Sequence, residues 1–83
     1  MYYLYIIECA DKTLYTGITT NLERRISEHN NTGLGARYTA SRRPVKLVYS
    51  KKFKNRSLAS KEEARIKKLG KSEKQELIKV RQD

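Results

Sequence analysis

Apolar and polar positions along the chain predict three strands and three helices. Aromatic and β-branched residues predict a strand over Tyr2 to Cys9, and a short polar turn follows at residues 10–12. Thr13 to Thr16 predict a return strand that ends at Gly17. Apolar residues at alternate positions predict a third strand over Val45 to Ser50. Helices are expected over residues 22–30, 57–69 and 72–81, and a basic loop with a short helical turn over 35–44.

The turn between the first two strands decides which side chains share a face of the sheet. If it has an odd number of residues, Tyr5 and Tyr15 lie on one face together with Gly17. An even number places the two tyrosines on opposite faces. Tyrosine is also a common strand residue, so ordinary packing is expected for Tyr2, Tyr3 and Tyr49.

Polar residues interrupt the apolar stripe of the first helix. A capping box predicts Thr20 or Asn21 as its N-cap. At about 100° per residue, one narrow face of this helix holds Leu22, Arg25, Ile26 and His29. An arginine beside an apolar stripe often only reaches out to water, and a lone histidine there is usually a core residue. Two such interruptions one turn apart, after two phase-matched tyrosines, favour a functional site.

The second helix also carries a charged residue in its apolar stripe. Ser57 is the predicted N-cap of this helix, and Gly70 is expected to close it. The inward positions are Ala59, Glu63, Ile66 and Leu69. Glu63 is either a site residue or a surface residue paired with Lys67 four positions on, and the sequence does not separate these readings. Ser72 with Gln75 predicts the start of the last helix.

The positive charge is concentrated in the second part of the chain. The 83 residues carry a formal charge of +10, and residues 35–61 contain nine bases and no acid. Such a field favours a polyanion, and nucleic acid is a better explanation than solubility alone. Tyr38 is expected to stack on a base, and cationic side chains are expected to contact phosphates, namely Arg37, Arg42, Arg43, Lys46, Lys51 and Lys52.

Length and cysteine content limit the other classes of function. The length fits one domain over residues 1–83, with a core over about 2–69. One cysteine and one histidine exclude an intramolecular disulfide and a zinc cluster of thiolates and imidazoles. No signal peptide or membrane span is evident, so a soluble cytoplasmic protein with no membrane partner is expected.

The interrupting residues suit hydrolysis of a phosphodiester. The carboxylate of Glu63 suits Mg²⁺ or Mn²⁺, with waters and the phosphate completing the shell. Arg25 suits a phosphate clamp, and His29 suits orienting the phosphate or passing a proton. Tyr5 is the candidate to take a proton from the attacking water, which requires that its pKa is lowered. Arg25, the metal and a hydrogen bond from Tyr15 are expected to lower it. A single candidate carboxylate argues against a two-metal site.

Four short motifs resemble those of the GIY-YIG endonuclease superfamily, most closely its small stand-alone bacterial (UPF0213-like) subgroup. Tyr3-Leu4-Tyr5 stands where that family has GIY, and Tyr15-Thr16-Gly17 stands where it has YIG. Asn21-Leu22-x-x-Arg25-x-x-x-His29 resembles the helix motif of the family. Glu63 falls on the metal-binding glutamate of the family, and the likeness extends from about residue 2 to 69.

The resemblance implies an α/β (α+β) fold, with a three-stranded antiparallel sheet flanked by helices. It also implies single-metal hydrolysis of DNA, with Arg25 as the catalytic arginine. Tyr3 in place of the first glycine and Thr16 in place of an apolar residue depart from the pattern without touching a catalytic group. DNA, or RNA, is the expected partner, and another protein is a candidate for targeting. The alternative is a non-catalytic nucleic-acid-binding module that uses the basic face over 35–61; a weaker one is an accessory protein that binds a protein partner.

Overall fold

Three antiparallel strands form the sheet. The computed structural model describes residues 1–31 and 42–82. The strands are β1 (Tyr2–Glu8), β2 (Leu14–Thr19) and β3 (Lys46–Phe53), and β1 lies in the centre because the order is β2-β1-β3. Both neighbours run antiparallel to β1. The predicted three-stranded antiparallel sheet is therefore confirmed.

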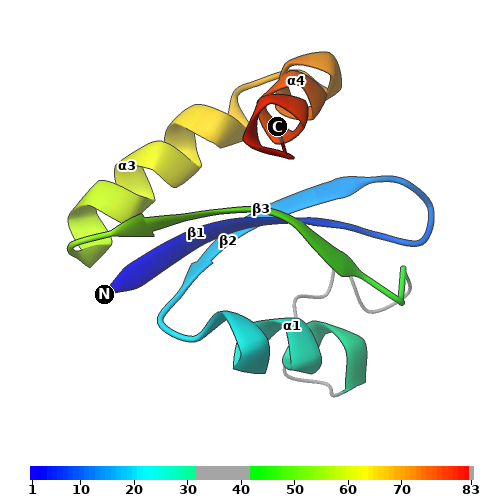
Figure 1. Cartoon of the computed structure of the whole chain (residues 1–83), viewed down its shortest axis with the longest axis horizontal. Coiled ribbons are helices and arrows are strands. Elements are labelled where there is room, and N and C mark those ends of the chain that lie inside the picture. The colour runs from blue at the N-terminus through cyan, green and yellow to red at the C-terminus, as the bar shows by residue number, and fades with distance from the viewer. Residues whose placement is uncertain (32–41, 83) are drawn as a thin grey trace.

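Helices cover both faces of this sheet. Helix α1 (Leu22–Asn31) lies on one side, and α3 (Arg56–Lys67) and α4 (Lys71–Gln82) lie on the other side (Figure 1). The α+β class is confirmed. In the part of the chain that the structure describes, no helix combines the length and the apolar character that a membrane span requires.

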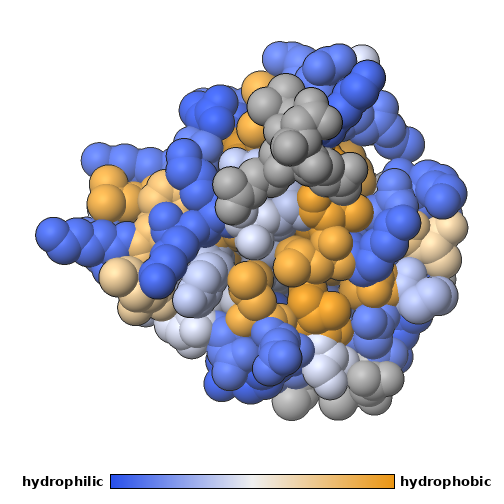
Figure 2. Space-filling model, viewed as in Figure 1, coloured by the Kyte–Doolittle hydropathy of each residue, from blue (hydrophilic) through white to orange (hydrophobic). Residues whose placement is uncertain are grey.

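Alternate residues of β1 supply the cores of both faces. On the side of α3 and α4, a cluster of buried residues consists of Leu4, Ile6, Tyr49 and Ile66. On the side of α1, the buried cluster consists of Tyr5, Ile7, Cys9 and Val45. Figure 2 shows one side of the molecule, on which apolar side chains gather in the middle and hydrophilic ones surround them. Each face of the strand thus has its own core, as the period-two geometry of a strand requires.

The register of the hairpin places Tyr5 and Tyr15 on one face. Tyr5 lies opposite Gly17, and Ile7 lies opposite Tyr15. Five residues separate the paired ends of the two strands, so the odd loop is confirmed. The prediction that Gly17 ends the second strand is wrong, because β2 continues through Gly17 to Thr19. This glycine serves the packing of the neighbouring strand, as described below, and not a turn.

A bulge in β3 breaks the alternation that the sequence predicts for this strand. Ile6 lies opposite Tyr49 but Ile7 lies opposite Leu47, so Val48 is an extra residue in the ladder. As a result, Val45 packs on the α1 side of the sheet and Tyr49 on the other side. The strand also continues to Phe53, three residues beyond its predicted end.

The helix caps differ from prediction in two of three cases. Asn21 caps α1, because its Oδ1 accepts the N–H of Arg24 at 3.0 Å. Asn55, and not Ser57, caps α3, because its side chain accepts from the N–H of Leu58 at 3.0 Å. This earlier start leaves Ser57 inside the helix.

The link between α3 and α4 also differs from prediction. Helix α3 ends at Lys67, and the glycine that was expected to close it instead precedes α4. The N–H of Gly70 donates to Oε1 of Glu73 at 3.2 Å, and its carbonyl accepts from Lys74 at 3.0 Å. This is half of a capping box, with the glutamate reaching back to the cap residue. Gly70 is therefore the N-cap of α4, two residues before the predicted Ser72.

Candidate functional site

The ring of Tyr5 lies directly over the backbone of Gly17. A Cβ atom at position 17 would lie 2.5 Å from the Tyr5 hydroxyl oxygen and 2.7 Å from Cζ. Both separations are far shorter than the roughly 3.5–4.0 Å at which carbon atoms normally pack. Only glycine leaves room for the ring, which gives the structural role predicted for Gly17 a physical basis.

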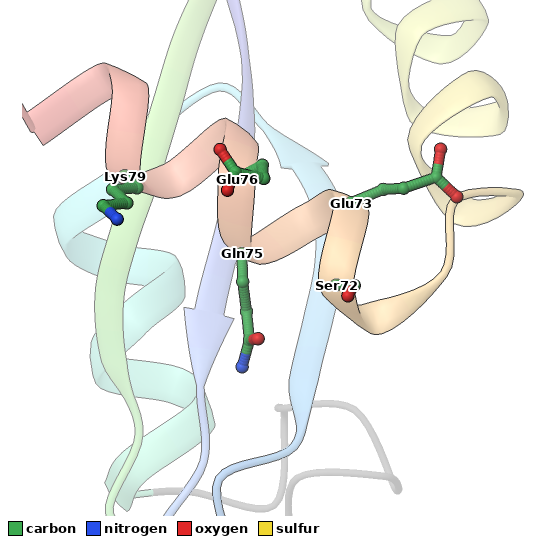
Figure 3. Close-up of a pocket in the computed structure, with 5 residues that line it drawn as sticks. All are labelled: Ser72, Glu73, Gln75, Glu76 and Lys79. Carbon is green, nitrogen blue, oxygen red and sulfur yellow. The ribbon is translucent and has the colours of Figure 1, made fainter.

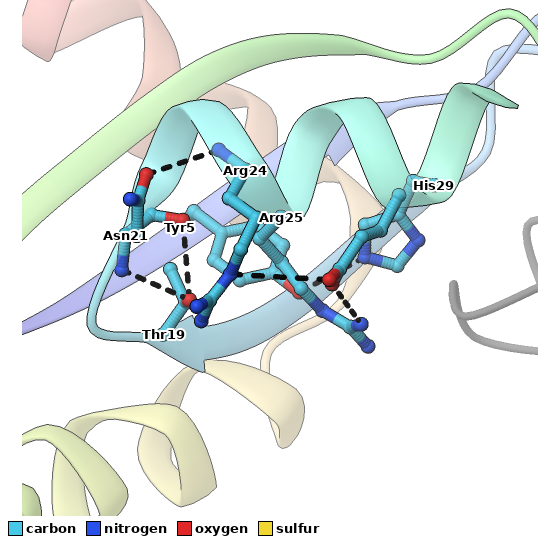
Figure 4. Close-up of polar contacts among 7 residues, drawn as sticks. Tyr5, Thr19, Asn21, Arg24, Arg25 and His29 are labelled. Carbon is cyan, nitrogen blue, oxygen red and sulfur yellow. Dashed lines mark hydrogen bonds and ion pairs between the residues drawn. The ribbon is translucent and has the colours of Figure 1, made fainter. Parts of the chain in front are cut away.

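Two side chains from α1 meet the Tyr5 hydroxyl. The oxygen lies 3.0 Å from Nε2 of His29, and Nε of Arg25 donates a longer hydrogen bond to it at 3.4 Å. Figure 4 shows Arg25 and His29 coming from the same helix toward Tyr5 on the strand below it. Tyr5 is only 1% exposed and His29 is fully buried. A phenol, an imidazole and a guanidinium therefore converge, as the spacing of these residues predicts.

Tyr15 completes a cluster of three rings. Its ring centroid lies 6.5 Å from that of Tyr5 and 5.3 Å from that of His29, and the centroids of Tyr5 and His29 are 5.9 Å apart. Both contacts of the imidazole are edge-on, a favourable geometry for aromatic pairs. The four predicted catalytic residues, Tyr5, Tyr15, Arg25 and His29, are thus brought to one place.

The environment raises the pKa of Tyr5, contrary to prediction. Burial is the largest cause, because it disfavours the charged phenolate. The hydrogen bond and the charge of Arg25 lower the pKa, as expected, whereas the neighbouring Tyr15 and Glu63 raise it. The predicted lowering by Tyr15 is wrong, because a second phenol competes for the negative charge. Tyr5 is a protonated phenol in this setting.

The same surroundings lower the pKa of His29. Burial contributes most and the positive charge of Arg25 comes next, while Glu28 opposes them. Arg43 adds to the lowering, and its Nε donates to the backbone carbonyl of His29 at 2.6 Å. The imidazole is therefore neutral near pH 7, with one nitrogen able to accept a proton.

Two contacts around the cluster were missed by sequence reasoning. Nη1 of Arg25 donates to Oε1 of Glu28 at 3.0 Å. The spacing of three residues on a helix was the available signal for this pair. Asn30 holds the start of β3, since its Nδ2 donates to the carbonyl of Val45 and its Oδ1 accepts from the N–H of Val45. No sequence pattern indicated this second contact.

Glu63 lies on α3, on the other side of the sheet. Its carboxylate forms an ion pair with Lys67 at 3.3 Å, so the surface pair considered from the sequence exists. The carboxylate is partly buried. Its negative charge is the smallest of the causes that shift the pKa of Tyr5, and it raises that pKa. Within residues 1–31 and 42–82, no three histidine, cysteine or acidic side chains gather into a metal site. One carboxylate fits a magnesium ion whose shell is completed by water and phosphate.

Two of the cations predicted to contact phosphate form ion pairs with acidic residues of the first hairpin. Arg37 and Tyr38 lie outside the described residues. Nε of Arg42 lies 3.0 Å from Oδ2 of Asp11, and Nζ of Lys46 lies 3.5 Å from Oε1 of Glu8. Hydrogen bonds from Thr13 are the largest cause of a lowered pKa of Asp11, and Arg42 adds to it. The basic segment is therefore partly neutralised by acids from the first hairpin.

The strand β3 presents two further cations to solvent. Lys51 and Lys52 are both exposed, and the ammonium of Lys51 lies 5.5 Å from the ring centroid of Phe53. Because Lys51 and Lys52 are consecutive in the strand, their side chains lie on opposite faces of the sheet.

Two hollows lie away from the polar cluster. One, of about 420 Å³, separates α1 from β3 and is lined by Leu22, Glu23, Ile26, Ser27, Asn30 and Leu47. The other, of about 380 Å³, lies along α4 and is lined by the residues that Figure 3 labels, Ser72, Glu73, Gln75, Glu76 and Lys79. In that view Glu73 points toward the turn before α4, where it accepts from Gly70. Neither hollow includes Tyr5, Arg25 or His29.

Comparison with known proteins identifies the family. A family model of the GIY-YIG catalytic domain matches residues 1–76. A UPF0213 protein of Desulfotalea psychrophila is 57% identical over 79 residues, which cover 95% of this chain and 72% of that protein. The solution structure of a protein from E. faecalis is 46% identical with a TM-score of 0.66, covering 95% of this chain and 83% of that one.

A second solved structure agrees with the first. The UPF0213 protein of Bacillus halodurans is 40% identical with a TM-score of 0.62, over 96% of this chain and 85% of that protein. The names of these relatives give no specific activity. The match over residues 1–76 and the convergence of Tyr5, Arg25 and His29 agree, and the chain belongs to the GIY-YIG family, a nuclease superfamily.

Proposed function

We propose that the protein is a metal-dependent endonuclease that hydrolyses phosphodiester bonds of DNA. The observation that carries this proposal is the Tyr5 hydroxyl, which lies 3.0 Å from Nε2 of His29 and 3.4 Å from Nε of Arg25. The ring of Tyr5 packs in the core on this face, and its hydroxyl, between a neutral proton acceptor and a fixed cation, suits proton transfer beside an anion. Membership of a nuclease superfamily supports the class of reaction.

Arg25 is the proposed phosphate-binding residue. Its guanidinium keeps its charge at any physiological pH and presents several donors in one plane. Because the side chain is only 25% exposed, its charge is less screened by water than that of a surface arginine. It would stabilise the additional negative charge that develops on the phosphate during attack by water.

Tyr5 and His29 are proposed to move the proton of the attacking water. A raised pKa makes Tyr5 a poor base by itself. However, as its oxygen takes a proton from water, its own proton can pass along the 3.0 Å contact to Nε2 of the neutral His29. No free phenolate needs to accumulate in this path. Tyr15 packs against both rings and would keep their orientation.

Glu63 is the proposed ligand of a single divalent cation, Mg²⁺ or Mn²⁺. When bound, such an ion would neutralise charge on the phosphate and on the leaving oxygen. The carboxylate is already partnered by Lys67, and this ion pair would be exchanged for the cation. DNA, or RNA, would be held by the exposed Lys51 and Lys52 together with Arg43, and by Arg37 and Tyr38 outside the described residues.

Arg25→Ala tests the proposal against a matched control. Cleavage of branched, damaged and single-stranded DNA with Mg²⁺ or Mn²⁺ should fall by roughly 10²–10³-fold, as when one donor to a developing charge is removed. Arg24→Ala removes the same charge from the same helix, but Arg24 is 60% exposed and points to Glu28 and not to Tyr5. It should keep its cleavage rate. Equal activity of both variants would refute the assignment of Arg25.

A second pair of variants tests the metal ligand. Glu63→Gln should abolish cleavage and weaken binding of Mn²⁺, measured by electron paramagnetic resonance in the presence of DNA. Glu62→Gln is the control. The carboxylate of Glu62, next to Glu63 in the sequence, forms an ion pair with Arg65 at 2.6 Å, and Glu63, not Glu62, contributes to the raised pKa of Tyr5. If Mn²⁺ binds both variants equally, Glu63 is not the ligand.

The alternative function is a non-catalytic nucleic-acid-binding module that uses the basic face over 35–61. The raised pKa and deep burial of Tyr5 favour it, because both work against a base. It predicts binding that weakens steeply with salt, and no turnover with either metal.

A further inference from the structure

The guanidinium of Arg25 lies between two partners. Its Nε donates to Tyr5 at 3.4 Å and its Nη1 donates to Oε1 of Glu28 at 3.0 Å. The shorter of the two contacts is the one to the carboxylate. Both members of that ion pair are largely shielded, with 25% of the arginine side chain and 21% of the glutamate side chain exposed. Glu28 therefore makes the stronger of these two contacts.

Two contacts to different nitrogens fix a guanidinium more firmly than one. The group is planar, so fixing Nε and Nη1 fixes the direction of its remaining donors. A single 3.4 Å bond to a phenol is too long to hold a long flexible side chain in one rotamer. Removing Glu28 takes away the shorter of these two contacts, which is the one that fixes Nη1.

We propose that Glu28 is a positioning residue, which holds the guanidinium of Arg25 against the Tyr5 hydroxyl so that the arginine meets the phosphate in one orientation. This rests on the proposed nuclease function, and it adds a residue outside the four predicted catalytic ones. Glu28 does not touch the reacting atoms. It acts through Arg25, and its effect should follow the hydrogen-bond acceptor and not the negative charge.

A second arginine near Glu28 makes a longer and more exposed contact. Arg24 approaches Oε2 of Glu28 only to 3.9 Å and is 60% exposed. Such an exposed pair contributes little. Of these two ion pairs the one with Arg25 is the closer, and a purely surface role of Glu28 would predict no effect of its removal on Arg25.

The test compares Glu28→Ala with Glu28→Gln. Glutamine keeps a carbonyl oxygen that accepts from Nη1, whereas alanine removes the acceptor. Glu28→Ala should lower kcat on the order of 10- to 100-fold, as expected from a misplaced group, with KM changed less, and Glu28→Gln should restore most of this loss. Glu23→Gln and Glu23→Ala on the same helix are controls, because Glu23 lines the hollow between α1 and β3. They should keep wild-type rates.

A readout without turnover separates this inference from the proposed function. The Nε–H signal of Arg25 in ¹⁵N-labelled protein should exchange slowly with water in the wild type and in Glu28→Gln, and rapidly in Glu28→Ala. If this holds while the wild type cleaves no DNA, the positioning stands and the nuclease proposal falls. If the wild type cleaves DNA but Glu28→Ala changes neither kcat nor the exchange, Glu28 has no positioning role. Equal losses in the alanine and glutamine variants would also overturn it, because charge and not the acceptor would then matter.

Discussion

The two faces of the sheet bury different kinds of side chain, although β1 contributes residues to both. Toward α3 and α4, β1 presents Leu4 and Ile6, which pack with Ile66 in an apolar cluster. Toward α1, the same strand presents Tyr5, whose hydroxyl meets a fully buried imidazole and a shielded guanidinium. Both faces have an apolar core, but on the α1 face buried polar groups lie beside it.

This difference separates stability from chemistry. Burying an apolar side chain stabilises the fold directly, whereas a buried polar group costs free energy unless it is paired. On the α1 face, the hydroxyl, imidazole and guanidinium are paired with one another. Substitutions in the apolar cluster beneath α3 and α4 should therefore change the free energy of unfolding, and substitutions of the polar residues on the α1 face should change cleavage.

The largest expected effect on stability is at Ile66. Ile66→Ala should lower the free energy of unfolding by roughly 2–5 kcal/mol, because the residue is fully buried in the apolar cluster. Urea unfolding measures this loss. Leu58→Ala on the same helix is the control, since Leu58 is exposed and should change stability by about 0.5 kcal/mol or less. The cleavage rate of folded Ile66→Ala protein should stay at the wild-type value; a lower rate would show that the faces are coupled.

Gly17→Ala should disrupt the packing of Tyr5 on the α1 face and abolish cleavage. The new Cβ would collide with the ring of Tyr5, at a cost of about 1–3 kcal/mol, and would displace its hydroxyl from His29. We expect cleavage to be lost at temperatures where the variant is still folded. Gly70→Ala is the matched change, because the nearest atom to its Cβ is Oε1 of Glu73 at an ordinary 3.6 Å. Comparable losses in both variants would contradict the special role of Gly17.

A smaller effect should appear in the pH dependence of stability. The folded state lowers the pKa of His29, so the unfolded chain takes up the proton first as the pH falls. The contribution of His29 is therefore complete above about pH 6.5 and is lost below it, with a slope of at most about 1.4 kcal/mol per pH unit. Urea unfolding between pH 5 and 7.5 measures it. Because the chain has one histidine, His29→Gln should remove this slope, and a slope that persists would show another origin.

The smallest effect concerns a buried hydroxyl on the apolar face. The hydroxyl of Thr16 is buried beside this cluster and has no hydrogen-bond partner among the described residues. Thr16→Val should raise the free energy of unfolding by about 1 kcal/mol, because an unpaired buried hydroxyl is removed without changing the shape. Thr19→Val should do the opposite, since the Thr19 hydroxyl is bonded to the backbone of Asn21. Thermal unfolding of the two variants tests the contrast in sign.

Local patterns were sufficient for the parts of the site that depend on period and spacing. The odd loop set Tyr5 and Tyr15 on one face, and the helical period placed Arg25 and His29 together beneath them. The pairing of Glu63 with Lys67 was also an available reading. These features follow from neighbouring residues along the chain.

Features that depend on burial or on partners far along the chain were not predictable. The pKa of Tyr5 is raised because α1 and the bare backbone at Gly17 enclose its ring, which no spacing reveals. The bulge at Val48 depends on how β3 meets β1. Asn55 and Ser57 are both favourable N-cap residues, so local sequence does not separate them.

The cleavage rate of Tyr5→Phe is the most direct test of the proposed site, because this substitution removes the oxygen that both His29 and Arg25 contact. Tyr3→Phe on the same strand and face removes a hydroxyl for which only ordinary packing is expected, and it is the control. We expect Tyr5→Phe to stay folded, to retain salt-dependent DNA binding and to lose cleavage by at least roughly 100-fold, while Tyr3→Phe cleaves normally. Cleavage by Tyr5→Phe at the wild-type rate would contradict the proposed site.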